Sequence, residues 1–509
     1  MNIRKLLTRL VSLVLIAVFL PTVAMADTWY LEDGSITVSA TESGQNVSQG
    51  GVTKADSAPV IRNRDSSAST TNNVTIKADT GATANVTLED TNIDTTGGAG
   101  PKGAGDAAVR TEGGGNVNLN VELDNTLQSG DTRAGVEKGN GGNLTIGSES
   151  GSGQLVAVGA DGGAGIGSED RLASGNYNVG NITITGGDIF ATGNGGGAGI
   201  GGGWYCSASD ITITGGNVTA VGKEDNPNRI GGAGIGGGGS QSSNAGGGSN
   251  LKITGGRVTA VGGNFSAGIG GSIGSNGDNI TISDAEVIAI GGTCAAGIGG
   301  GCRLGNGIVG QGTNISISGS ANVKAAGGVG DSMDGAGAAI GAGGSHQGTT
   351  AQEGAADTSG LSPDGSVERL DPGTTFDIPQ PKPRSSFPKP APDPVAVEEE
   401  PQPVKAALYR VIDDAGKALP VETKQEDGVL LLTAQADIAI LEGAISGLQT
   451  LQSRGIDTIT FTNGTISVSF SLAEVIAKGA SSDVYRLTLS GGEANFTLAD
   501  ADITALLGK

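Results

Sequence analysis

Isoleucine alternates with threonine in a phrase that recurs along the middle of the chain. In residues 181–187, NITITGG, the isoleucines stand two positions apart, which is the period of a half-buried β-strand. The two glycines that follow permit a sharp bend. Residues 188–193, DIFATG, and residues 198–203, AGIGGG, supply two further short apolar segments. One repeat therefore predicts three strands and three bends, which make one triangular coil.

The phrase returns often enough to build a stack of such coils. Its second isoleucine falls at positions 146, 184, 213, 253, 282 and 317, so the steps range from 29 to 40 residues while the motif is kept. Constant motifs separated by variable loops are typical of a solenoid, in which insertions map to the corners. A coil cannot bury its isoleucines alone, and burying one between neighbouring coils contributes about 1.5–3 kcal/mol. Residues 143–344 are therefore expected to form a parallel β-helix.

The segment before these repeats holds weaker copies of the same pattern. Residues 74–76, 86–88 and 117–119 alternate like strands. Terminal repeats are expected to be atypical because they cap the stack. We therefore interpret residues 27–142 as degenerate N-terminal coils. Weak and strong copies together give about eight to ten coils, or roughly 40–50 Å at the spacing of neighbouring strands.

The pattern changes beyond residue 344. Residues 345–405 are rich in proline, which favours extended polyproline II and predicts a linker. Residues 406–509 regain a globular pattern. Apolar positions three and four apart over residues 438–451 predict a helix, and residues 458–470 predict a β-hairpin. We expect this last region to be a small α+β domain.

The start of the chain predicts export. Arg4, Lys5 and Arg9 precede a short apolar run, and residues 24–26, AMA, place small side chains where a signal peptidase cleaves. Residues 1–26 are therefore expected to be a signal peptide, with a retained membrane anchor as the alternative. The sequence shows no second apolar stretch, so we expect a secreted protein without a transmembrane segment in its mature part.

Composition and charge narrow the class of protein. The chain of 509 residues has 94 glycines, 3% aromatic residues and a formal net charge of −22. Glycine at this level is typical of flexible chains. A flexible chain would not need evenly spaced isoleucines, so the isoleucine pattern favours a folded structure. A strongly acidic protein is repelled by nucleic acid phosphates, so we exclude nucleic acid as a partner.

The repeat closely resembles repeats in secreted and cell-surface proteins of Gram-positive bacteria. Its successive parts are NITITGG, VTA, GG and AGIGGG. These proteins look like pectate lyases in fold, bind carbohydrate and lack lyase activity. The resemblance covers residues 73–343. It implies an all-β protein with a right-handed parallel β-helix, export, and binding to acidic polysaccharide, sometimes with calcium. No binding residue is carried over, because the shared positions are isoleucine, glycine, alanine and threonine.

The cysteines allow one cross-link. Cys294 and Cys302 flank the segment AAGIGGG and would meet in a disulfide if that segment turns. Cys206 is then left over, and three small buried thiols are the alternative interpretation.

The candidate metal ligands are a pair of acidic residues. Asp284 and Glu286 stand, in one repeat only, where other repeats have the bend Thr-Gly-Gly-Asn, and Ca²⁺ prefers carboxylate oxygens. Solvated surface acids are the alternative interpretation in a chain this acidic. Calcium is the one cofactor that the sequence leaves open.

Exposed aromatic rings often carry sugar binding, and Trp204 and Tyr205 follow an AGIGGG segment directly in a predicted corner. They are the candidate ligand contacts, with packing over the stack as the alternative. His346 is the only histidine and begins the predicted linker. Nucleophilic triads and histidine zinc sites both need a positioned histidine, so no catalytic residue is assigned.

Three functions remain open at this point. The leading hypothesis is a non-catalytic extracellular binding protein or adhesin that contacts polysaccharide or a cell surface through the β-helix. The first alternative is a polysaccharide lyase or glycoside hydrolase, because such enzymes also use this fold. The second alternative is a structural spacer that displays the C-terminal domain.

Overall fold

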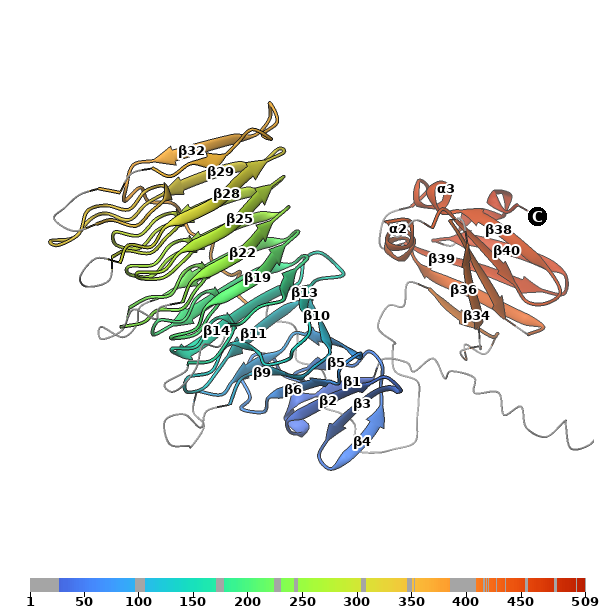
Figure 1. Ribbon diagram of the computed structural model, residues 1–509. Coiled ribbons are helices and arrows are strands. Elements are labelled where there is room, and N and C mark those ends of the chain that lie inside the picture. Colours follow the sequence, from blue (N-terminus) through green and yellow to red (C-terminus); the bar gives the residue numbers. More distant parts are fainter. Residues whose placement is uncertain are drawn as a thin grey trace, which may run out of the picture. The chain divides into compact units, whose positions relative to one another are not determined.

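The computed structural model describes residues 27–96, 106–170, 178–223, 230–241, 246–303, 308–345, 350–351, 353–384 and most of 409–508. The predicted signal peptide and His346 lie outside the described residues. The chain divides into two compact units, Met1–Ala391 and Pro392–Lys509. In the first unit, successive coils stack into a rod with three parallel sheets along its sides (Figure 1).

From β7 to β30, each coil contributes one strand to each sheet, in the chain order A, C, B; in the described residues the first two coils lack the sheet C strand and the last coil lacks the sheet B strand. Sheet A contains β1 (Thr28–Tyr30), β5 (Val60–Arg62), β7 (Thr83–Glu89), β10 (Asn116–Glu122), β13 (Leu144–Gly147), β16 (Ile182–Ile184), β19 (Ala208–Ile213), β22 (Gly248–Ile253), β25 (Gly277–Ser283), β28 (Gly312–Ser318) and β31 (Ala356–Asp357). Sheet C contains β8 (Asn92–Asp94), β11 (Asp124–Gln128), β14 (Gln154–Asp161), β17 (Asp188–Asn194), β20 (Asn217–Gly222), β23 (Arg257–Val261), β26 (Glu286–Ile290), β29 (Asn322–Ala326) and β32 (Ser366–Leu370).

Sheet B has the shortest strands and the most regular stack. It contains β2 (Ile36–Thr41), β6 (Val74–Ala78), β9 (Val109–Gly113), β12 (Val136–Lys138), β15 (Ile166–Gly167), β18 (Ile200–Gly201), β21 (Ile235–Gly236), β24 (Ile269–Gly270), β27 (Ile298–Gly299) and β30 (Ile340–Gly341). Ile200 pairs in register with Ile166 below and Ile235 above, and all three are buried. The three-strand coil predicted from the repeats is confirmed.

The first coil is closed by a short antiparallel extension. Strand β2 pairs with β3 (Gly44–Gln49), which pairs with β4 (Val52–Ala55), while the 3₁₀ turn η2 (Leu31–Asp33) places Leu31 in the core. An uncovered sheet edge would offer unpaired N–H and C=O groups to other chains. The weaker pattern over residues 27–142 thus corresponds to coils and a cap that share one hydrophobic core with the later repeats.

Glycine fills the narrow edge of the rod where coils approach backbone to backbone. A Cβ atom on Gly199 would lie 2.4 Å from the amide nitrogen of Val221 and 2.7 Å from the carbonyl oxygen of Gly234. Real Cβ atoms do not come this close to backbone, so only glycine fits. The high glycine content therefore serves close packing between neighbouring coils.

The predicted linker over residues 345–405 is wrong for its first half. Strand β31 pairs with β28, and β32 pairs with β29, so this part of the chain adds one more coil to the rod. Val367 of β32 stacks on Val323 of β29, which supplies the apolar contact that a coil needs. Residues 371–384 then run back along the rod and hydrogen-bond to it, and proline content alone gave no sign of that.

The second unit is a small α+β domain, as predicted. One antiparallel sheet contains β33 (Arg410–Ile412), β36 (Ile438–Ala444), β39 (Val484–Ser490), β40 (Glu493–Leu498) and β41 (Ala501–Asp502). A second sheet contains β34 (Val421–Glu426), β35 (Val429–Ala434), β37 (Thr458–Thr462) and β38 (Ser467–Ser471). The remaining elements are α2 (Ile445–Ser453), α3 (Leu472–Ile476) and η3 (Thr504–Leu506).

The predicted helix over residues 438–451 is half right. Its second part is α2, but its first part is β36, which pairs with β39 along its whole length. Ile438 and Leu441 fit a helical spacing by coincidence, because a buried central strand is also apolar along its length. The predicted hairpin is confirmed as β37 and β38. Among the described residues, no helix has the length and apolar character needed to cross a membrane.

Candidate functional site

One polar residue begins every sheet C strand from β11 to β32, and these residues stack in register. We call this row the axial ladder; it consists of Asp124, Gln154, Asp188, Asn217, Arg257, Glu286, Asn322 and Ser366. Eight positions at the spacing of parallel strands extend over roughly 34 Å. The ladder lies at the corner where the chain turns from sheet A to sheet C.

One cleft of the rod follows the upper part of this ladder, toward the later coils. It has a volume of about 600 Å³ and is an open groove, lined by the ladder residues Asn217, Arg257, Glu286 and Asn322 and by Gly151, Gly187, Gly216, Gly256, Asp284, Ala285, Ser320 and Asp364. Its glycines belong to the bends between sheets A and C. Because glycine has no side chain, the bends leave a backbone floor below the ladder side chains.

The two predicted metal ligands both line this groove. The Asp284 carboxylate accepts hydrogen bonds from the backbone N–H of Ser320 at 2.9 Å and from its hydroxyl at 3.1 Å. Glu286 forms an ion pair with Arg257 of the neighbouring coil, with 2.7 Å between Nη2 and Oε2.

Calcium takes six to eight converging oxygen ligands. Among the described residues, neither Asp284 nor Glu286 belongs to a group of three acidic, histidine or cysteine side chains whose ligand atoms converge. Both carboxylates already have protein donors. These contacts favour the interpretation of Asp284 and Glu286 as hydrogen-bonded surface acids.

The groove carries more negative than positive charge. Asp284, Glu286 and Asp364 contribute carboxylates, and Arg257 contributes the one guanidinium among the lining residues. The whole chain is also acidic, with a formal net charge of −22. Charge of one sign in a groove favours ligands that are neutral or of opposite sign.

The predicted aromatic contacts lie elsewhere, and one of them is buried. Trp204 is 3% exposed and fills the space beside Gly196, where a Cβ atom would come within 2.0 Å of its ring. Its ring meets Tyr205 edge to face, with 5.3 Å between centroids. Trp204 therefore packs over the stack, which was the alternative interpretation, while Tyr205 stays half-buried at the surface.

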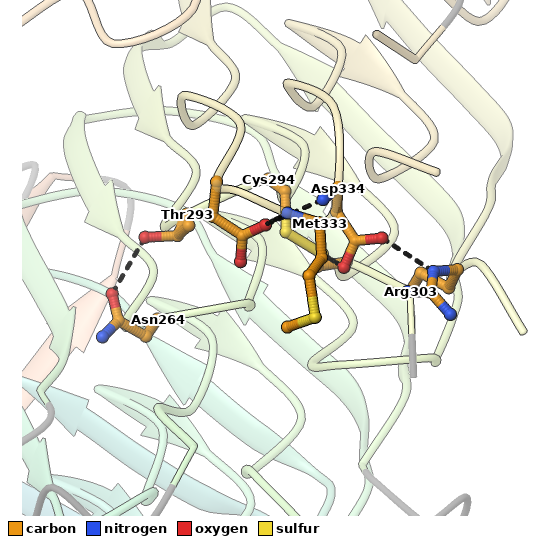
Figure 2. Close-up of a disulfide and its surroundings, with 8 residues drawn as sticks. Asn264, Thr293, Cys294, Arg303, Met333 and Asp334 are labelled. Carbon is orange, nitrogen blue, oxygen red and sulfur yellow. Dashed lines mark hydrogen bonds and ion pairs between the residues drawn. A yellow bond between two sulfur atoms is a disulfide. The ribbon is translucent and has the colours of Figure 1, made fainter. Parts of the chain in front are cut away.

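The structure joins Cys294 and Cys302 by a disulfide, with Cα atoms 5.2 Å apart. Figure 2 shows Asp334 and Arg303 beside it, joined by an ion pair of 2.7 Å. The two sulfur atoms and the Asp334 carboxylate lie within 4.8 Å of one another, but disulfide sulfurs are not thiolates and do not act as metal ligands. Cys206 is buried outside the disulfide.

A second cleft of about 380 Å³ lies at the corner between sheets B and A, and no sequence motif indicates it. Lys138 occupies an inward position of β12 and donates a hydrogen bond from Nζ to the Asn140 carbonyl at 2.5 Å. Burial lowers the pKa of Lys138 to about 8.

Charged side chains surround Lys138 in this cleft. Glu137 is 4% exposed and pairs with Arg110 and Arg133 at 3.3 and 3.2 Å. Burial raises the pKa of Glu137, and Arg133 beside it opposes that shift. Glu169 also lines the cleft and pairs with Arg133.

Comparison with known proteins supports the β-helix fold but does not indicate a ligand or an activity. The family model described as Beta helix repeat matches residues 182–204, 211–239, 251–274 and 280–302. These segments hold the isoleucine phrases and contain the groove residues Asn217, Arg257, Asp284 and Glu286. No curated protein and no solved structure gave a significant match.

Proposed function

We propose that this parallel β-helix protein is an extracellular, non-catalytic binding protein whose axial groove holds a linear polysaccharide. The observation that carries the proposal is the open groove of about 600 Å³, in which polar side chains recur coil after coil. A linear polymer laid along the rod would meet one such side chain at each coil. Amide, guanidinium and carboxylate groups are the donors and acceptors that sugar hydroxyls need.

The charge of the groove selects among polysaccharides. Three carboxylates and one guanidinium line it, so an acidic polymer would be repelled. A neutral polymer, or one that carries amino groups, meets no such barrier. This conclusion differs from the acidic ligand that the sequence resemblance implies, and it follows from the lining residues Asp284, Glu286 and Asp364.

The test compares polymers and variants. Affinity is measured by calorimetry for neutral, amine-bearing and acidic polysaccharides with the full chain. The double variant Asn217→Ala with Arg257→Ala removes two adjacent ladder side chains. We expect it to weaken binding about tenfold or more, which corresponds to about 1.4 kcal/mol.

Lys252→Ala is the matched control. Lys252 stands on the outer side of sheet A, five residues before Arg257, and is exposed. Its loss should leave binding unchanged if the groove is the site. An affinity that falls equally in both variants, or binding confined to acidic polymers, would overturn the proposal.

The second cleft supports a second candidate function, a polysaccharide lyase or hydrolase. A general base works best when its pKa lies near the working pH, and the pKa of Lys138 is about 8. Two carboxylates, Glu137 and Glu169, line the same cleft. Unsaturated products that absorb in the ultraviolet, formed from a uronate polymer and lost in Lys138→Met, would favour this candidate over the binding protein.

A further inference from the structure

Residues 371–384, which we call the strap, cross the outer face of sheet C and return from the last coils toward the first. At one end, the Gly373 amide donates to the Gly327 carbonyl at 2.9 Å, just beyond the end of β29. At the other end, Lys382 contacts the first residues of β14 and β17. Nine extended residues span about 28 Å, which exceeds the roughly 19 Å of four strand spacings.

Two side chains that point outward from sheet C, Thr219 and Thr259, are buried in the coils between the two ends of the strap. Val218 and Ala220 point into the core, so Thr219 between them points outward, yet it is 6% exposed. Thr259 of the next coil is 2% exposed. Phe376 and Ile378 of the strap are half-buried, while Asp377 between them is exposed, as expected for a segment that packs one side against the rod.

Lys382 docks onto two successive positions of the axial ladder. Its backbone N–H donates to Gln154 Oε1 at 2.8 Å, and Gln154 Nε2 donates back to the Lys382 carbonyl at 3.2 Å. Its Nζ forms an ion pair with Asp188 at 2.7 Å. Burial raises the pKa of Asp188, but the hydrogen bonds from Lys382 and Asn217 and the charge of Lys382 together lower it below its ordinary value.

The Arg384 side chain contacts the two coils that precede the coil of β14 along the rod. Its guanidinium donates to the carbonyl of Thr91 at 2.9 Å, to the carbonyl of Asp124 at 2.6 Å and to the carboxylate of Asp90 at 2.9 Å. Asp90 is 3% exposed. An arginine held by two carbonyls and a buried carboxylate is a specific contact, unlike a solvent-exposed ion pair.

The strap has a backbone that cannot join the sheet. Pro379, Pro381 and Pro383 alternate with Gln380, Lys382 and Arg384, and proline has no N–H to donate to a strand ladder. Between its two ends the strap is therefore held by side chains rather than by a continuous row of backbone hydrogen bonds. Such a segment can leave the rod without disturbing the coils below it.

We propose that the strap is a latch that occupies the lower half of the same ladder whose upper half forms the open groove. The two halves are continuous, because Asn217 in the groove donates from Nδ2 to Asp188 Oδ1 at 2.8 Å. Release of the latch adds three ladder positions, Asp188, Gln154 and Asp124, to the groove. The regulatory part of this proposal rests on polymer binding by the groove, whereas the occupancy of the ladder by the strap does not.

The test uses the full chain with Lys382→Ala and Arg384→Ala combined. A protease that cleaves before bulky apolar residues should cut at Phe376 and Ile378 at least tenfold faster in the double variant than in the wild type. Affinity for a long polymer should rise about tenfold, while affinity for an oligomer that fits the upper groove stays unchanged. Lys324→Ala is the control, because Lys324 lies exposed on sheet C and contacts Glu368 rather than the strap.

The outcomes separate the two proposals. Unchanged cleavage of the strap in the double variant would overturn the latch. Suppose that the wild type binds the long polymer and that the double variant is cleaved faster but binds this polymer with the same affinity. That result would overturn the regulatory role of the latch. If the wild type binds no polymer, the function proposed for the groove fails, and the cleavage rates alone then support or overturn the latch.

Discussion

The first coils of the rod and its later, glycine-rich coils fill the space at sheet B in different ways. In the first coils, sheet B strands such as β6 and β9 have five residues and fill the interior with side chains. In the later coils the corresponding strands have two residues, Ile-Gly, and neighbouring backbones touch. The difference shows that glycine here increases packing density, although its abundance in a sequence usually suggests flexibility.

The largest expected effect comes from adding one methyl group at the narrow edge. Gly199→Ala places Cβ within 2.4–2.7 Å of backbone atoms of the next coil, in β20 and in the residue that precedes β21, and backbone held in two sheets cannot move aside easily. We expect the free energy of unfolding to fall by about 3 kcal/mol or more, measured by denaturant unfolding. Gly186→Ala is the control, because its nearest atoms lie 3.7 Å away and its effect should be small. Equal losses in both variants would mean that the edge is not close-packed.

The disulfide occurs only in the later coils, and its removal should have the next largest effect. Cys294 and Cys302 are separated by eight positions, and closing so short a loop contributes about 2–3 kcal/mol. Cys302→Ser should lower the stability of the last coils, seen as faster amide hydrogen exchange there. Exchange in the first coils should remain as in the wild type, and a uniform increase along the rod would contradict this expectation.

A smaller effect is expected at an asparagine of sheet A in the later coils. Asn279 adopts a left-handed backbone conformation, with φ of 55°, and donates to Asn250 Oδ1 at 3.2 Å. Asn279→Ala should cost about 1–2 kcal/mol, because alanine is strained there. Asn279→Gly keeps the conformation and loses only the hydrogen bonds, so it should cost less. Thermal unfolding of both variants measures the difference, and a costlier glycine variant would contradict the backbone explanation.

The smallest expected effect is a gain in the first coils. Lys138 has a pKa of about 8 in the folded protein, below its ordinary value of 10.5, so its charged form is disfavoured by folding. The penalty is fully present below pH 8 and disappears as the pH rises toward 10.5. Lys138→Met should therefore stabilise the protein by about 1 kcal/mol at pH 7 and less at pH 10. A gain that does not change with pH would assign the effect to packing.

The sequence predicts the fold well and the site only in part. Ile182 and Ile184 indicate strand, bend and coil because their spacing repeats, and the structure confirms them. The sequence predicts Asp284 and Glu286 as metal ligands, and both line the groove. Their neighbours Asn217 and Arg257 were missed as site residues, although each follows a Gly-Gly bend directly.

The remaining differences have physical reasons. Trp204 was expected at the surface, but the side chain is buried because Gly196 leaves room for its ring. Lys382 and Arg384 lie in a proline-rich segment, where no periodicity reveals that the chain folds back over two hundred residues. Lys138 sits in a weak repeat, in an inward position that local sequence does not mark.

The central claim is that a linear polymer lies along the upper axial ladder, and its position on the rod can be measured directly. A neutral polysaccharide that carries photo-reactive groups would be bound to the full chain, cross-linked, and its attachment sites identified by mass spectrometry. The account predicts cross-links to residues at and beside Asn217, Arg257, Glu286 and Asn322, one coil after another. Cross-links on the outer faces of sheets A or B, or scattered without a row, would contradict it.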